Sequence, residues 1–147
     1  ELTSVKLGKN LKYMGKSAFA KNSLASLIIP DTVETIDNCA FLGNKLTFLT
    51  LGNKLKHIGN GAFYANKLAS VDIPDAVEII ESGAFNNNSL TLLKLGKNLK
   101  YIGEQAFAEN SLESFVIPDS VETIVKDAFL NNQLTPKTKK AVGLFSS

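Results

Sequence analysis

The chain has 147 residues, 44% of them hydrophobic and 20% charged, and its 16 lysines against 14 acids leave a formal net charge of +2. This is an ordinary globular composition, and no apolar run approaches the roughly 18 residues of a membrane-spanning helix, so such a helix is excluded. One cysteine excludes an internal disulfide and a multi-cysteine metal site, and the lack of arginine counts against nucleic-acid recognition.

A 22-residue period runs through the chain without insertion or deletion. Each period opens with a leucine, and the copies are Leu2, Leu24, Leu46, Leu68, Leu90, Leu112 and Leu134. An Ala-Phe pair also recurs, with phenylalanines Phe19, Phe41, Phe63, Phe85, Phe107 and Phe129. Three residues later stands an asparagine: Asn22, Asn44, Asn66, Asn88, Asn110 or Asn132. We therefore expect six stacked repeats, coils 1 to 6, over residues 1–133, beginning at the first six of these leucines.

Each coil should open with an extended segment, because Val5 and Leu7 alternate with Ser4 and Lys6 in coil 1. Glycine or proline should end this segment, since neither continues a paired strand well. Odd coils carry Gly8, Gly52 and Gly96 at this position, and even coils carry Pro30, Pro74 and Pro118. The larger unit is therefore a pair of coils.

A second, brief extended or 3-10 segment is expected around apolar pairs such as Val33 and Ile36. A tight turn should follow at the asparagine, whose side chain bonds nearby backbone and tolerates left-handed dihedrals. Because one coil cannot bury its own apolar face, neighbours about 4.8 Å away must cover it, which predicts ladders of phenylalanine and of asparagine.

One charged column supports this register. It alternates in sign as Lys12, Glu34, Lys56, Glu78, Lys100 and Glu122. Stacking therefore places opposite charges side by side, whereas like charges would repel. Each exposed pair is worth only about 0.2 to 1 kcal/mol, and we interpret the column as structural rather than as a ligand site.

The combination of Leu24-x-x-Leu27-x-Ile29-Pro30, Val33-x-x-Ile36 and Ala40-Phe41 resembles the bacterial surface leucine-rich repeat of the BspA type, also called the Treponema pallidum type. The resemblance covers about residues 2 to 135. It implies a right-handed leucine-rich-repeat solenoid with a parallel sheet on the concave side and short β or 3-10 segments on the convex side. Many members carry cysteine in the column of Asn22 to Asn132, and this departure argues against a redox role.

The resemblance also implies a location and a function. Such repeats occur in surface or secreted proteins of bacteria and some parasitic protists, and similar ones occur in Gram-positive adhesins, including choline-binding ones. They imply an extracellular, non-enzymatic adhesion module that binds a host or matrix protein. The alternative is a rigid spacer that projects another domain from the cell surface.

Candidate catalytic residues are few, so we expect no enzyme, cofactor or metal. His57 is the sole histidine and lies in a variable column, and Cys39 occupies another variable position. Acids recur once per pair of coils at Asp31, Asp75 and Asp119, so their copies should lie roughly 10 Å apart, which is wide for a shared ion.

Binding is expected on the outward columns of the first segment. Phe48 and Leu92 interrupt a serine-rich column, and Ile28 and Val116 lie in the next one. The predicted ligand-binding residues are Ile28, Phe48, Thr50, Asp72, Leu92, Lys94 and Val116. A weaker candidate patch consists of Leu42, Tyr64 and Leu130. The alternatives are that other parts of the parent protein cover this face, or that the apolar residues are scattered without meaning.

Residues 134–147 depart from the period and include Lys137, Lys139 and Lys140. They are expected to form a degenerate seventh repeat that caps the core, or a linker. A basic membrane-surface segment is less favoured, because three lysines are few. Since the chain begins at Glu1, we expect a fragment or processed form, a monomeric solenoid within a larger chain, without nucleic-acid binding or membrane insertion.

Overall fold

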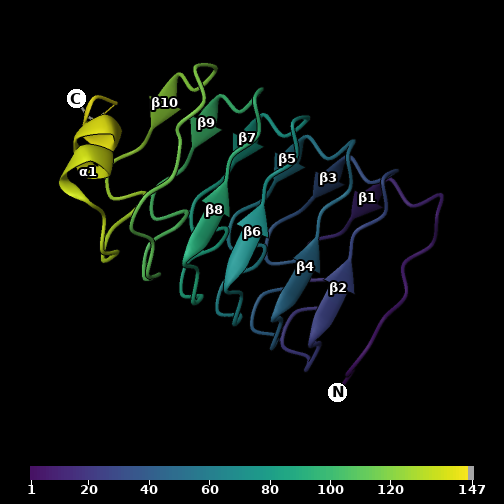
Figure 1. Ribbon diagram of the computed structural model, residues 1–147. Helices are drawn as coiled ribbons and strands as arrows, with labels where there is room; N and C mark the ends of the chain where they lie inside the picture. The colour runs from purple at the N-terminus through teal and green to yellow at the C-terminus, as the bar shows by residue number, and fades with distance from the viewer. Residues whose placement is uncertain (146–147) are drawn as a thin grey trace.

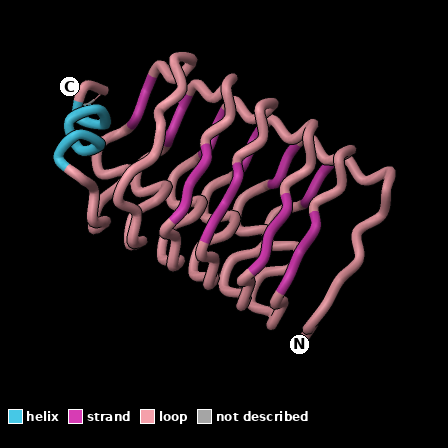
Figure 2. Tube along the Cα trace, viewed as in Figure 1, coloured by secondary structure: helices cyan, strands magenta, loops and turns pink. Residues whose placement is uncertain are grey.

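The computed structural model describes residues 1–145 as a stack of coils, with the N-terminus at one end and the helix α1 at the other (Figure 1). The strands run in two rows along the stack (Figure 2). One row holds β1 (Tyr13–Met14), β3 (Thr35–Ile36), β5 (His57–Ile58), β7 (Ile79–Ile80), β9 (Tyr101–Ile102) and β10 (Thr123–Ile124). The other row holds β2 (Ser26–Ile28), β4 (Phe48–Thr50), β6 (Ser70–Asp72) and β8 (Leu92–Lys94). The leucine-rich-repeat solenoid expected from the sequence is thus confirmed.

The second extended segment of each coil forms the continuous sheet, a six-stranded parallel sheet in the order β1-β3-β5-β7-β9-β10. Equivalent residues pair directly, as Ile36 does with Ile58. In β5 the Ile58 side chain is fully buried and His57 faces outward. This distribution differs from the expected one, in which the main sheet comes from the first segment and the second segment is only a short element.

The first segment instead forms two separate two-stranded sheets, β2-β4 and β6-β8. We call their outer surface, together with the equivalent segments of coils 1 and 6, the strand-pair face. The N–H of Ile73 donates to the carbonyl of Lys94 in coil 5 at 2.8 Å. Because successive N–H groups of a strand point to opposite neighbours, the next one would face coil 3, but Pro74 has no N–H. Each proline thus removes a ladder donor at the boundary between an odd coil and the even coil after it.

At the boundary between an even coil and the odd coil after it, glycine instead allows the two backbones to come close together. A Cβ atom on Gly52 would lie 2.2 Å from the carbonyl oxygen of Pro30, and one on Gly96 would lie 2.3 Å from that of Pro74. These contacts are with backbone atoms, which cannot rotate away as a side chain can. Only glycine therefore allows the close approach that accompanies β2-β4 and β6-β8 pairing.

We expect Gly52→Ala to destabilise the chain by about 1 to 3 kcal/mol, because the new methyl group would force coils 2 and 3 apart. The matched control is Gly8→Ala, where a Cβ would meet no atom within 4 Å. Urea unfolding monitored by circular dichroism measures both. Equal stability of the two variants would contradict the role of Gly52 in coil spacing.

The core contains the phenylalanine ladder that the period predicts. Phe41, Phe63, Phe85 and Phe107 are fully buried, and rings of neighbouring coils are stacked with centroids 5.3 to 5.5 Å apart. Leucine, isoleucine, valine and alanine side chains of every coil fill the space around it. One hydrophobic core therefore runs the length of the stack.

The predicted asparagine ladder is also present and joins each coil to the one before it. The Asn66 amide donates to the carbonyls of Phe41 at 3.0 Å and Phe63 at 3.1 Å, and its oxygen accepts the Leu46 N–H at 3.0 Å. Asn66 itself is not the left-handed residue: Ala65, just before it, has φ 60°. A second left-handed column contains Cys39, with φ 59°.

The charged column stacks in the predicted register. The Glu34 N–H donates to the Lys12 carbonyl at 2.8 Å, and the Lys56 N–H donates to the Glu34 carbonyl at 2.9 Å. Within residues 1–145, however, no side chains of this column form an ion pair within 4.0 Å. The alternating charges therefore lie near one another without direct contact, which limits their contribution to stability.

The helix α1 (Pro136–Gly143) follows coil 6. Thr135 is its N-cap and accepts the Thr138 N–H at 3.3 Å, and the proline at its first position suits a helix start. Val142 and Phe145 pack against the core. We propose that this segment is the cap rather than the linker. Across the described part of the chain, no helix combines the length and apolar character required to cross a membrane.

Candidate binding surface

The strand-pair face carries all the residues predicted to bind a ligand. Phe48 pairs in register with Ser26, and Leu92 pairs in register with Ser70. Their outward side chains are well exposed, 54% for Phe48 and 69% for Leu92. By contrast, the inward side chains of the same strands pack in or against the hydrophobic core.

The structure divides these residues into two clusters. Ile28, Phe48 and Thr50 come together on β2-β4. Asp72, Leu92 and Lys94 lie on β6-β8, and the exposed Val116 follows on coil 6. Because β4 and β6 form no ladder with each other, this surface is not one continuous parallel sheet of the kind that the family resemblance implies.

One hollow of about 330 Å³ lies on this face over the paired strands β6-β8. Three further grooves lie at the boundaries between an odd coil and the next even coil, where proline interrupts the ladder. Their volumes are about 340 Å³ between coils 1 and 2, 370 Å³ between coils 3 and 4, and 450 Å³ between coils 5 and 6. We call them the first, central and last grooves. Pro30, Pro74 and Pro118 line one groove each.

Six of the seven predicted ligand-binding residues, all but Leu92, line these grooves, whereas the grooves themselves and Lys6, Lys9 and Lys97 were not predicted. The first groove includes Lys6 and Lys9, and the last groove includes Lys94 and Lys97 at the equivalent positions. The signal was available as a Lys-x-x-Lys pattern that recurs four periods later, just before a proline-bearing coil. The pattern becomes informative only with the structure, which shows that neighbouring coils do not pair at these boundaries and that the lysines line the resulting grooves.

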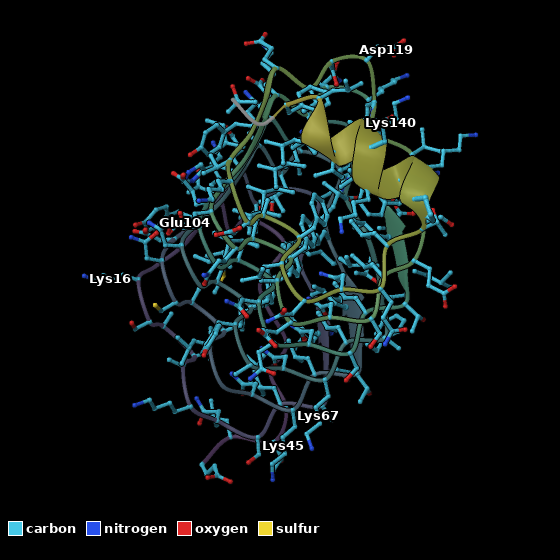
Figure 3. All side chains as sticks on the ribbon, turned by 90° about the vertical axis from the view of Figure 1, so that its left-hand side faces the viewer. Lys16, Lys45, Lys67, Glu104, Asp119 and Lys140 are labelled. Atoms are coloured by element: carbon cyan, nitrogen blue, oxygen red, sulfur yellow. The ribbon has the colours of Figure 1, made fainter. Side chains whose placement is uncertain are left out.

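Charged side chains are spread around the rest of the coil. Figure 3 looks at the stack from the helix end and shows Lys16 and Glu104 on one side, Lys45 and Lys67 at the lower edge, and Asp119 at the opposite edge. Because both signs are present around the coil, no single-sign field covers the molecule, in agreement with the small net charge.

The continuous sheet carries two polar pairs that each join an odd coil to the next even coil. His57 Nε2 lies 3.0 Å from a Glu81 carboxylate oxygen, with both side chains about one-third exposed. The Tyr13 hydroxyl donates a hydrogen bond to the Asp37 carboxylate. This hydrogen bond is the main cause that lowers the pKa of Asp37, and the hydrogen bond donated by the Asn38 N–H is the next largest. The same contact with Asp37 raises the pKa of Tyr13.

The other candidates for chemistry have structural partners. Asp31 accepts the Asn53 N–H at 2.9 Å, and Asp75 accepts the Lys97 N–H at 3.0 Å, so these acids bond the backbone of the following coil. Cys39 is a partly buried free thiol in a turn. Residues 1–145 contain no group of three or more histidine, cysteine or acidic side chains placed to hold a metal ion.

The weaker loop patch is only partly assembled. Leu42 and Tyr64 occupy neighbouring coils, and a Cβ atom at Gly61 would touch both side chains. Leu130 is 41% exposed but lies on coil 6, three coils beyond Tyr64. The patch therefore offers less contiguous apolar surface than the strand-pair face.

Comparisons with known proteins agree with the stack of coils. No curated protein matches the chain. The family model of the BspA type leucine rich repeat region matches residues 12–135 in six copies. Repeats of this kind form scaffolds for protein–protein interaction, typically without catalysis, and their proteins are typically at the surface or secreted. The chain therefore belongs to the BspA type leucine-rich-repeat family.

Proposed function

We propose that this chain is a non-enzymatic adhesion module of a microbial cell-surface protein, which binds a host or matrix protein through the strand-pair face. The observation that carries the proposal is the exposure of four large apolar side chains on that face, at Ile28, Phe48, Leu92 and Val116. None of the four belongs to the hydrophobic core. Exposed apolar groups gathered on one face are typical of protein contact sites.

The geometry supports a protein partner better than a small molecule. The two apolar clusters lie on different strand pairs, and a ligand must span several coils to contact both. A protein surface can do this, and its binding energy would be concentrated in a few buried side chains. Phe48 and Leu92 are the best candidates, because each is the largest exposed apolar side chain of its strand pair or the only one.

Replacing Phe48 and Leu92 together by serine is expected to weaken adhesion to immobilised extracellular-matrix protein by about tenfold or more, because both apolar contacts are lost. The labelled chain and its variant are compared by surface plasmon resonance. The matched control replaces Tyr13 and Ile79 by serine; both are exposed apolar side chains, but they lie on the continuous sheet and outside this face. Unchanged circular dichroism and thermal melting keep folding separate from binding.

The second candidate function is a rigid spacer that projects another domain from the cell surface. Stacked phenylalanine rings and a continuous sheet along the whole molecule make a stiff rod, which is the observation that favours this second function. A chain that binds no host cell or matrix protein, while its parent protein does, would support the spacer over the adhesion module.

A further inference from the structure

We propose that the first and last grooves are two equivalent sites for a partner polypeptide that presents apolar side chains flanked by carboxylates. The proposal rests on the proposed binding function and specifies the chemistry of the partner. It adds Lys6, Lys9 and Lys97 to the residues of the two clusters that line these grooves.

The two grooves are built from the same positions of the repeat. Every residue that lines the last groove has a counterpart four periods earlier in the wall of the first groove. The counterparts are Val5 and Leu93, Lys6 and Lys94, Leu7 and Leu95, Lys9 and Lys97, Leu27 and Phe115, Ile28 and Val116, and Pro30 and Pro118. In every one of these pairs, the apolar or basic character is kept.

Each groove offers an apolar wall beside two positive charges. In the first groove Leu27 is buried at the base and Ile28 is 65% exposed at the rim. In the last groove Phe115 is partly buried and Val116 is 81% exposed. An aliphatic or aromatic side chain that enters either groove would cover this surface and remove it from water.

The lysines are largely free to bind an external anion. Within residues 1–145, no carboxylate lies within 4.0 Å of the ammonium groups of Lys6, Lys9 or Lys94. Lys97 contacts Asp75 at 3.8 Å, but both side chains are mostly exposed, so this pair is weak. Asp72 is paired in register with Lys94 without an ion pair, so a ligand carboxylate does not have to displace an existing one.

The central groove has the same place in the repeat and the opposite chemistry. Its residues Thr50 and Asn53 stand where the outer grooves have lysines, and Asp72 stands where they have Ile28 or Val116. An acidic, apolar segment would be repelled there rather than attracted. An acidic, apolar segment should therefore bind the outer grooves and not the central one, whereas non-specific hydrophobic binding would not distinguish the three grooves.

The spacing of the outer grooves suits an extended polypeptide. Four coils at about 4.8 Å separate them by roughly 19 Å, and an extended chain covers that distance in about six residues. A segment with two acidic–apolar groups at this spacing can occupy both grooves at once. The second contact is then intramolecular and raises the overall affinity.

The test uses the full chain and a fluorescein-labelled peptide, Asp-Phe-Glu-Ser-Gly-Ser-Asp-Phe-Glu, in which the phenylalanines are six residues apart. Fluorescence anisotropy should show binding at least about tenfold tighter than that of a peptide with one Asp-Phe-Glu group. The matched peptide with lysine in place of every acid should not bind, because its positive charges are repelled by the lysines of the grooves. Raising the salt concentration should weaken binding of the acidic peptide.

Two sets of variants place the binding in the grooves. Lys6→Gln with Lys94→Gln should weaken peptide binding by about tenfold, because each groove loses a charge. The control, Lys12→Gln with Lys100→Gln, removes the same charge from equivalent positions outside the grooves and should change affinity less than about twofold. Thr50→Lys, Asn53→Lys and Asp72→Val together should give the central groove the chemistry of the outer grooves. The number of single-group peptides bound per chain should then rise.

Several results would overturn the proposal. Equal binding of the acidic and lysine peptides, or equal effects of the groove and control variants, would show that the lysines do not select the partner. Groove-dependent binding to phosphatidylglycerol–phosphatidylcholine vesicles without peptide binding would identify a lipid surface instead. Matrix adhesion that is lost with the Phe48 and Leu92 variant, without acidic-peptide binding, would reject the groove sites and leave the proposed function intact. Peptide binding without matrix adhesion would support the groove sites and reject the proposed adhesion function.

Discussion

Replacing Phe63 by alanine is expected to lower the free energy of unfolding by about 3 to 5 kcal/mol. Phe63 is fully buried in the middle of the ladder, with the ring of Phe41 at 5.5 Å on one side and that of Phe85 at 5.3 Å on the other. The substitution removes contacts with both neighbours and leaves a cavity inside a stack that cannot collapse along its axis. Because each coil contacts mainly its neighbours, the loss weakens two interfaces at once.

Equilibrium urea unfolding measures the effect, and Phe48→Ala is the matched control. It makes the same chemical change at a side chain that is 54% exposed, so it should alter stability by no more than about 0.5 kcal/mol. Similar destabilisation by both substitutions would show that the ladder is not the core of the molecule.

Replacing Asn66 by alanine should cost about 2 to 4 kcal/mol, although it removes little apolar surface. Its amide is 6% exposed and bonds three backbone groups in two coils, at Leu46, Phe41 and Phe63. Alanine leaves that buried donor and those carbonyls without this partner, and a solvent-excluded site has little water to replace it. The expected loss is therefore electrostatic rather than hydrophobic.

Asn53→Ala is the control for this prediction, because Asn53 is exposed and uses its backbone N–H, not its side chain, to bond Asp31. Thermal and urea unfolding should show near-wild-type stability for Asn53→Ala and a clear loss for Asn66→Ala. Hydrogen exchange at the Leu46 amide gives a second readout, since its protection should fall when the acceptor is removed. Unchanged protection at Leu46 would contradict the hydrogen bond from its N–H to the Asn66 side chain.

The repeating pattern makes much of the fold predictable from the amino-acid sequence. Each position occurs six times, so the phenylalanine and asparagine columns identify the register directly. Alternation along the first segment correctly places Phe48 and Leu92 on the outside. The period also shows that Asp31 and Asp75 are equivalent, but their bonds to backbone N–H groups of the following coil become visible only in the stack.

Other features could not be read from the period. The left-handed turn position is Ala65 rather than Asn66, and the Asn66 side chain instead bonds the backbone of two coils. His57 lies in a variable column, yet it pairs with Glu81 of the next coil. Both outcomes depend on which groups of a neighbouring coil come within hydrogen-bond distance.

The coil length, the register and the side chains that enter the core all follow from the repeat, because apolar periodicity dictates which face each residue must take. The tertiary structure decided where neighbouring coils hydrogen-bond and where they part. At one boundary the coils part because proline has no N–H to donate to the ladder. At the next boundary they pair because Gly52 has no Cβ atom to collide with the backbone of Pro30. The grooves exist only between coils, and no property of a single repeat could have revealed them.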